Sequence, residues 1–147
     1  AFFPPLGFAV TLALITALNW LVPLSLSGPI AGVGAALGIV LCCIAAALGL
    51  LAILAFRAVG THVEPHKPTS AIVRGGVYRI SRNPMYLGLI LMTLGIGLWF
   101  GNLWVFPGAV AFWFALDRGV VAREEVYLTE KFGDAYTALL EESRRWL

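Results

Sequence analysis

Residues 75–88 read GGVYRISRNPMYLG, and this stretch joins a polar part of the chain to an apolar one. Its first eight residues include two glycines and two arginines, whereas its last residues begin a long apolar run. From Asn83 to Leu116 the chain contains no Asp, Glu, Lys, Arg or His, and the same is true of everything before Arg57. The charged side chains therefore fall into two blocks, each of which follows an apolar region.

The overall composition agrees with this division. Of the 147 residues, 60% are hydrophobic and 12% are charged, whereas soluble domains are about half apolar and about a quarter charged. Such a composition is typical of an integral membrane protein. The length predicts one membrane domain over residues 1–147, without a separate soluble domain.

The first 56 residues predict two membrane spans. Leu6–Leu26 and Ile30–Phe56 are each long enough to cross a hydrocarbon core of about 30 Å. A cleaved signal peptide is the alternative for the first segment, but no basic region precedes it and a second apolar segment follows closely. We therefore expect a retained span in which Pro23 introduces a kink and Asn19 bonds to a neighbouring helix.

Two shorter apolar segments, Met85–Phe100 and Leu103–Leu116, predict a helical hairpin with a turn at Gly101 and Asn102. The expected fold class is therefore an all-α integral membrane protein with about four transmembrane helices. The interfacial loop at 57–82 carries five Lys or Arg residues, which favours the cytoplasmic side of the membrane. Four spans would then place both termini in the cytoplasm.

Small residues recur at every fourth position of the second span. Gly34, Gly38, Cys42 and Ala46 would form a seam that another helix approaches closely. Cys42 and Cys43 are adjacent and lie deep in the span, so we interpret them as small core residues and not as a disulfide or metal pair.

The polar segment 117–145 predicts a C-terminal amphipathic helix. Glu125, Phe132 and Tyr136 recur at helical spacing on one face, which is otherwise apolar. Gly133 weakens this helix and marks a bend or a close approach.

Two adjacent carboxylates, Glu124 and Glu125, lie near the start of that helix. A carboxylate near membrane depth needs a polar partner, and such groups are candidates for function. The structural alternative is an ion pair with Arg118, with Arg123 or with the basic loop. The pattern alone leaves both alternatives open.

Two linked motifs carry a resemblance to a known family. They are Gly76-x-Tyr78-x-x-x-Arg82-Asn83-Pro84-x-Tyr86-x-Gly88 and, after a helical hairpin, Glu124-Glu125-x-x-Leu128-x-x-x-Phe132-Gly133-x-x-Tyr136 with a terminal Arg144-Arg145-Trp146. Together they resemble the isoprenylcysteine carboxyl methyltransferase family, whose catalytic core is shared with the phospholipid N-methyltransferases. The likeness is to bacterial members and covers residues 59–147. It implies that residues 57–147 form a methyltransferase-like core behind the two N-terminal spans.

The resemblance implies an enzyme that uses S-adenosylmethionine as its cofactor. The cofactor would enter from the cytosol and a lipophilic acceptor from the bilayer. That acceptor would be an isoprenylcysteine-like carboxylate or a related lipid group, and a phospholipid amine is the alternative. The family usually has His where this chain has Asn83. An amide keeps the capacity to hydrogen-bond there but cannot titrate.

The resemblance also assigns the candidate site residues. Arg82 and Glu125 would be catalytic. The cofactor would be bound by Tyr78, Asn83, Pro84, Tyr86, Gly88, Glu124 and Glu125.

The chemistry of these side chains is consistent with such a cofactor. Carboxylates suit its ammonium group and ribose diol, whereas the fork of Arg82 suits a carboxylate. Pro84 favours a helix start, whose free N–H groups form an anion site. Gly88 would leave room beside the backbone, whereas helix packing is the favoured interpretation of Gly95 and Gly97.

A function of another class would be a non-enzymatic metal or haem module built on His62 and His66. Pro65 lies between them and disfavours the helix that would bring the two imidazoles together. The net charge of +2 gives no reason to expect a nucleic acid partner. We expect the chain in the inner membrane of a bacterium, surrounded by lipid, with its site facing the cytoplasm.

Overall fold

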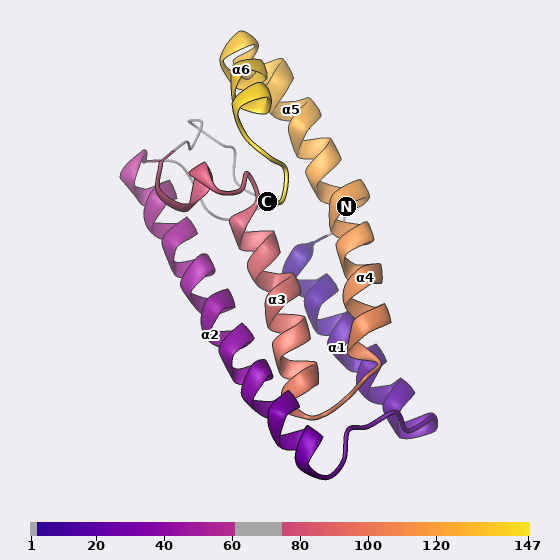
Figure 1. Ribbon diagram of the computed structural model, residues 1–147. Helices are drawn as coiled ribbons and strands as arrows, with labels where there is room; N and C mark the ends of the chain where they lie inside the picture. Colours follow the sequence, from indigo (N-terminus) through magenta and orange to yellow (C-terminus); the bar gives the residue numbers. More distant parts are fainter. Residues whose placement is uncertain (1–2, 61–74) are drawn as a thin grey trace.

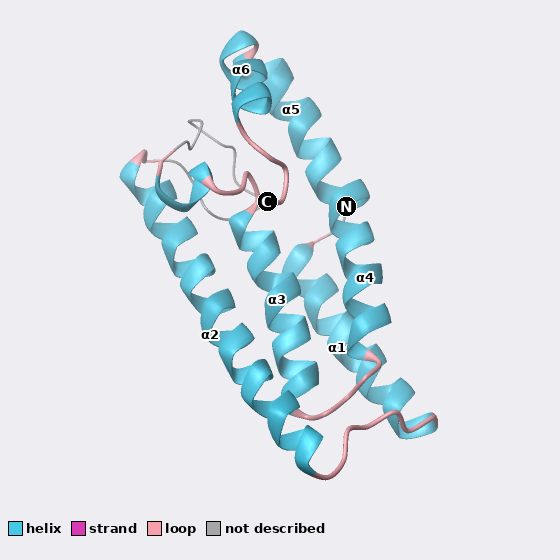
Figure 2. Ribbon diagram, in the orientation of Figure 1, coloured by secondary structure: helices cyan, strands magenta, loops and turns pink. Residues whose placement is uncertain are grey.

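The protein is described by a computed structural model that covers residues 3–60 and 75–147. The longer helices run side by side, and shorter elements form a cap at one end of them (Figure 1). In chain order the elements are α1 (Pro4–Leu21), α2 (Pro29–Ala58), the 3-10 turn η1 (Gly76–Arg79), α3 (Pro84–Trp99), α4 (Val105–Leu116), the π-helical turn η2 (Asp117–Val121), α5 (Ala122–Phe132) and α6 (Asp134–Glu142). The described residues contain helices and loops without a named strand (Figure 2). The prediction of an all-α fold is confirmed.

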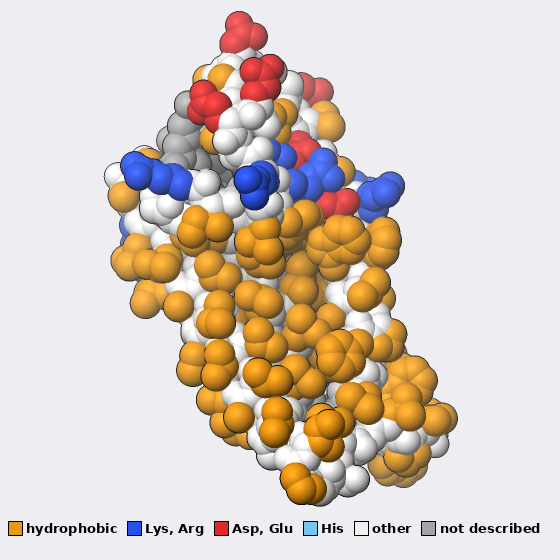
Figure 3. Space-filling view, in the orientation of Figure 1, with side chains coloured by type: hydrophobic (Ala, Val, Ile, Leu, Met, Phe, Trp, Pro, Cys, Tyr) orange, Lys and Arg blue, Asp and Glu red, His pale blue; other side chains and the backbone are white. Residues whose placement is uncertain are grey.

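The long helices are apolar enough to lie in a membrane. Among the described residues, three helical stretches are long and apolar enough to cross one, namely Pro4–Leu21, Pro29–Ala58 and the continuous stretch Val105–Phe132, and α3 is a shorter apolar helix. Hydrophobic side chains cover the body of the molecule, whereas charged side chains gather at the end that carries α5 and α6 (Figure 3). The chain is therefore a membrane protein. The apolar part of its last long helix ends at Leu116, directly before Asp117 and Arg118.

Proline fixes where three of these helices begin. α1, α2 and α3 each start with a proline, whose fixed φ suits the first helical turn, where no N–H partner is needed. The first span ends earlier than expected, at Leu21 and not at Leu26. Pro23 is the reason, because the residue before a proline is disfavoured in the helical region. The kink that we expected within the span is thus the end of the helix.

Asn19 also differs from its prediction. Its amide nitrogen donates to Ser25 Oγ at 3.0 Å, and its Oδ1 accepts the Leu24 N–H at 2.9 Å. Both partners lie in the loop that follows α1, so Asn19 supports the turn after its own helix. The prediction of a bond to a neighbouring helix was wrong.

The seam of small residues on α2 packs against α3. A Cβ added at Gly38 would collide with the backbone of Gly95 and Trp99, and one at Gly95 would lie 2.6 Å from Cys42 Sγ. Ala46 is exposed and Ala45 is buried in its place. The buried positions therefore do not keep to the expected four-residue repeat. A helix has 3.6 residues per turn, so the residues that face a partner helix are separated by a mixture of three-residue and four-residue steps.

Hydrogen bonds close the apolar end of the bundle. Buried Asn102 donates from Nδ2 to the Ile15 carbonyl at 3.0 Å, and its Oδ1 accepts the Trp104 N–H at 2.9 Å. Gly97, one turn before the loop, packs against Val105. The turn expected at Gly101 and Asn102 is confirmed, and so is the interpretation of Gly97 as a packing residue.

The opposite, charged end is built from the second half of the chain. α4 continues through η2 into α5 without a break, and Gly133, at φ +58°, then reverses the chain into α6. The expected bend at Gly133 is confirmed. From Ser143 onward the chain leaves helical geometry and returns toward the start of α3 (Figure 1).

Candidate active site

The last five described residues, which we call the tail (Ser143–Leu147), lie against the segment that enters α3. Arg82 Nη1 donates to the Ser143 carbonyl at 2.7 Å and to the Leu140 carbonyl at 3.3 Å. The Arg82 backbone N–H donates to the Arg144 carbonyl at 3.0 Å. Asn83 Nδ2 donates to the Arg145 carbonyl at 2.8 Å. The chain segment 81–83 thus fixes the tail across the polar end of the bundle.

Glu125 lies between two arginines at the centre of this arrangement. Arg82 Nη2 donates to its Oε1 at 3.2 Å, and Arg145 Nε donates to the same oxygen at 3.0 Å. Arg145 Nη2 donates to the second oxygen, Oε2. The side chains of Arg82 and Glu125 are only 12% and 16% exposed. The ion pair that was expected as the structural alternative for Glu125 is therefore present, and Arg82 of the basic loop is one of its partners.

Asp117 is a second buried carboxylate that holds the tail. It lies in η2, and its Oδ1 accepts hydrogen bonds from Trp146 Nε1 at 2.9 Å and from Arg145 Nη1 at 3.2 Å. Arg118, which is exposed, approaches the other oxygen at 3.5 Å. Single π-helical turns inside longer helices are frequent at functional sites. Here the turn directs Asp117 toward the tail.

Arg145 therefore bridges two carboxylates from one continuous helix. Its hydrogen bonds with Glu125 raise its pKa, and those with Asp117 act in the same direction. Burial raises the pKa of the neighbouring Tyr136 to about 12, and the charge of Glu125 adds to that effect. Both groups keep their ordinary protonation state at neutral pH, so the arginine stays charged and the phenol stays neutral.

Glu124 has a different environment from Glu125. Tyr86 Oη donates to its Oε1 at 2.6 Å, but Glu124 forms no ion pair with any residue that the structure describes. Burial raises the pKa of Glu124, and the hydrogen bond from Tyr86 acts in the opposite direction. Glu124 is thus a partly buried acid without a cationic partner among the described residues.

Tyr78 lies on the α2 side of the same end. Its ring contacts Phe56 edge to face, with the ring centroids 5.5 Å apart, and it packs on Ala52. Burial and, secondarily, the charge of Glu124 raise its pKa. The hydroxyl of Tyr78 therefore lies within the electrostatic reach of Glu124.

Pro84 and Gly88 both belong to α3, and their places on that helix determine whether they face the site. Pro84 is the first residue of α3 and is buried. A Cβ added at Gly88 would lie 3.2 Å from the Ala45 carbonyl of α2. Tyr86 faces Glu124, and a step of two residues on a helix turns the side chain by about 200°. Gly88 is thus placed in the interface with α2, away from Glu124.

One donor in the site has no partner among the described residues. Arg82 Nε is buried and lacks a hydrogen-bond acceptor within the described part of the chain. Buried polar groups are satisfied in the large majority of cases, so an exception requires an explanation. A carboxylate oxygen of a ligand is the kind of acceptor that an arginine Nε–H suits.

The structure thus brings together five of the residues that the sequence singled out, namely Arg82, Asn83, Tyr86, Glu124 and Glu125. Tyr78 and Pro84 border this group, and Gly88 does not belong to it. Asp117 and the role of Arg145 were not predicted from the sequence. The one available signal was that Asp117 directly follows a long apolar run, where a buried carboxylate indicates function or pairing.

His62 and His66 lie outside the described residues, as do the neighbouring positions of the basic loop from 61 to 74. The metal or haem alternative built on these histidines therefore has no counterpart in the structural description. It stays a prediction from the sequence.

Comparison with known proteins shows the family to which the chain belongs. The model of a family described as phospholipid methyltransferase matches residues 33–135, a range that contains Arg82, Asp117, Glu124 and Glu125. An uncharacterized protein of Haemophilus influenzae is 43% identical over 63 residues, which are 43% of this chain and 100% of that protein. No solved structure matches the chain. Because the family model spans well over half of the residues, the chain belongs to the phospholipid methyltransferase family.

Proposed function

We propose that the protein is an S-adenosylmethionine-dependent membrane methyltransferase that acts on a lipophilic acceptor, either an isoprenylcysteine-like carboxylate or a related lipid group. Membership of the family supports methyl transfer in a membrane. One observation carries the proposal: two polar groups of the site have no matching partner among the described residues. Glu124 lacks a cation, and Arg82 Nε lacks a hydrogen-bond acceptor.

These two groups fit the two ends of the cofactor's amino acid portion. Arg82 Nε would donate to the carboxylate, and Glu124 would accept from the ammonium group or from the ribose hydroxyls. When bound, the cofactor supplies a methyl group made electrophilic by its positively charged sulfonium. In a site that excludes water, a buried carboxylate such as Glu124 stabilises such a cation more than it would in solution.

Tyr86 and the Arg145 bridge have supporting roles in this proposal. Tyr86 orients the Glu124 carboxylate through its 2.6 Å hydrogen bond. Arg145 and Arg82 neutralise Glu125, so that Glu124 is left as the carboxylate available to a ligand. Methyl transfer is an in-line displacement, and the protein therefore contributes alignment, exclusion of water and charge balance but no nucleophile.

The acceptor class depends on whether a proton must be removed. A carboxylate acceptor needs no base, whereas an amine must lose a proton before it can attack. Glu124 is a suitable base, because burial raises its pKa above that of an ordinary glutamate. This observation, together with the description of the family, favours keeping a phospholipid amine as the second candidate.

The proposed orientation places the site at the cytoplasmic face of a bacterial inner membrane, with both termini on that side. It is supported by the arginines of the charged end, since basic residues are retained on the cytoplasmic side.

We expect Glu124→Gln to weaken binding of S-adenosylmethionine about tenfold, which corresponds to about 1.4 kcal/mol. The substitution keeps the shape and removes the negative charge that would face the ammonium or sulfonium. Calorimetric titration of the detergent-purified protein with S-adenosylmethionine and S-adenosylhomocysteine measures the effect. Glu141→Gln is the matched control, because Glu141 is exposed on α6.

Two results would contradict the proposal. One is the absence of saturable binding of either ligand to the folded wild-type protein. The other is an equal loss of affinity in Glu124→Gln and Glu141→Gln, because the effect would then reflect net charge and not the site.

We also expect affinity for S-adenosylmethionine to rise with pH through the pKa of Glu124, which burial raises. Protonated Glu124 is neutral and attracts no cation. Binding of the cationic ligand lowers the pKa of Glu124, so binding at a pH near the pKa of the free protein releases a proton. Titrations in two buffers of different ionisation enthalpy measure this proton. Glu124→Gln should abolish the pH dependence and the proton release, and a variant that retained both would assign them to another group.

The two acceptor classes can be separated chemically. Methyl groups transferred from radiolabelled S-adenosylmethionine to a carboxylate form an ester, which mild base releases as methanol. A methylated amine keeps its label under the same treatment. Incubation with lipid extracts and with a prenylated cysteine analogue therefore identifies the class.

A further inference from the structure

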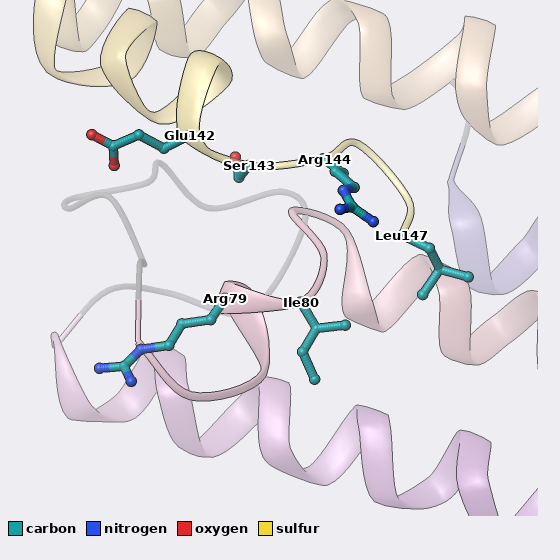
Figure 4. Close-up of a pocket in the computed structure, with 6 residues that line it drawn as sticks. All are labelled: Arg79, Ile80, Glu142, Ser143, Arg144 and Leu147. Carbon is teal, nitrogen blue, oxygen red and sulfur yellow. The ribbon is translucent and has the colours of Figure 1, made fainter.

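A cavity of about 380 Å³ lies beside the tail. Residues of η1 and its exit form one wall, and the end of α6 with the tail forms the other (Figure 4). The lining residues are Arg79, Ile80, Glu142, Ser143, Arg144 and Leu147. The mechanism proposed above uses none of these side chains as a ligand of the cofactor.

The cavity combines unpaired cations with exposed apolar groups. The guanidinium groups of Arg79 and Arg144 are exposed, and neither has a hydrogen-bond or ion-pair partner in the described part of the chain. Ile80 is 62% exposed and Leu147 is 67% exposed. A soluble ligand would gain little from such aliphatic side chains, whereas a ligand with an anionic head and an apolar chain can contact both kinds of group.

The position of this cavity agrees with an amphipathic ligand. Arginine and lysine side chains lie directly above the apolar surface of the helices, at the boundary where lipid headgroups would begin (Figure 3). In Figure 4 the Arg144 side chain extends toward Leu147, on the side where Ile80 also lies. Glu142, the one carboxylate among the described lining residues, extends from the opposite side of the cavity. Arg144 is thus adjacent to both apolar groups, whereas the Arg79 side chain extends on the other side of the cavity, as Glu142 does.

We propose that this cavity binds the headgroup of an anionic phospholipid from the surrounding membrane. Arg144 would fork onto the phosphate, Arg79 would supply a second positive charge at the rim, and Ile80 and Leu147 would contact the upper part of the acyl chain. Basic residues near an anionic membrane surface are attracted to it. This inference goes beyond methyl transfer and does not depend on it.

The proposal links the lipid to the neighbouring site through the backbone. Arg144 and Ser143 carry two of the three carbonyls that accept hydrogen bonds from Arg82, and Leu140 carries the third. A lipid phosphate bound to the Arg144 side chain would therefore hold the tail in the place where it meets the candidate active site.

The test compares the binding of two lipids by one protein. Association of spin-labelled phosphatidylglycerol and phosphatidylcholine with the full chain in nanodiscs gives their selectivity ratio. The Arg79→Gln, Arg144→Gln double variant should reduce this ratio about fivefold or more, as expected for the loss of two interfacial charges. Arg123→Gln, on the exposed face of α5, removes the same type of charge elsewhere and should reduce the ratio much less.

Three outcomes would overturn the proposal. The first is an unchanged ratio in the double variant, and the second is an equal reduction per charge in Arg123→Gln, which would indicate unspecific attraction. The third is displacement of the lipid label by millimolar inorganic phosphate at constant ionic strength, since this would assign the cavity to free anions.

Ile80→Ser tests the apolar contact separately. With both arginines intact, this variant should weaken phosphatidylglycerol binding, and an unchanged affinity would contradict the apolar contact.

Discussion

Replacement of Arg82 with alanine is expected to lower the free energy of unfolding by about 3 kcal/mol, as for removal of one partner from a buried ion pair. The guanidinium of Arg82 donates to the carbonyls of Leu140 and Ser143 and to the Glu125 carboxylate. Alanine leaves the two carbonyls without this donor and leaves Glu125 with Arg145 as its remaining partner, in a place that water reaches poorly. Thermal unfolding in detergent measures the loss, and hydrogen exchange over residues 140–147 should show a tail that has lost its protection.

Two further variants make this prediction specific. Arg82→Lys keeps the charge but not the planar fork, so we expect it to recover only part of the stability. Arg123→Ala removes an exposed arginine and should change stability by less than about 0.5 kcal/mol. If Arg82→Ala matched the wild-type melting temperature and tail exchange, the hydrogen bonds of Arg82 would not hold the tail.

Gly38→Ala is expected to destabilise the protein by about 1–3 kcal/mol, although alanine is the better helix former. The added Cβ would meet backbone atoms of Gly95 and Trp99 and not a side chain that could move aside. α2 and α3 would have to separate along their whole contact, which includes Gly95 against Cys42. A lower melting temperature in detergent checks this expectation.

Gly32 provides the matched control for that substitution. It lies on the same helix, and a Cβ added there would have no atom within 4 Å. Gly32→Ala should therefore leave the melting temperature unchanged or raise it slightly. Equal destabilisation by Gly32→Ala and Gly38→Ala would show that the helices do not pack as closely as described.

Much of the fold follows from features that act locally. The two stretches without charged residues could only lie in an apolar environment, and the prolines at the helix starts have one favoured place in a helix. Gly133 predicted the bend between α5 and α6 because a left-handed φ suits glycine. These features depend on neighbours within a few residues, so a sequence is enough to find them.

The parts that were predicted wrongly or missed depend on contacts between distant residues. Whether Ala45 or Ala46 faces α3 depends on how the two helices cross, which no spacing rule within α2 decides. Asn19 forms its hydrogen bonds with the loop that follows its own helix and not with another helix. Arg145 and Asp117 are 28 residues apart, and their ion pair depends on the reversal at Gly133 and on the path of the tail.

That path also sets the order in which a newly made chain can complete the site. Arg82 is synthesised early, but the carbonyls and the arginine that surround it belong to residues 140–145, which leave the ribosome after all of the long helices. Chains fold progressively from the N-terminal side during synthesis. The helices must therefore be inserted while Glu125 and Asp117 still lack Arg145, and the two carboxylates gain this shared partner only when the tail arrives. Assembly of the apolar bundle and completion of its polar site are thus separate events in time.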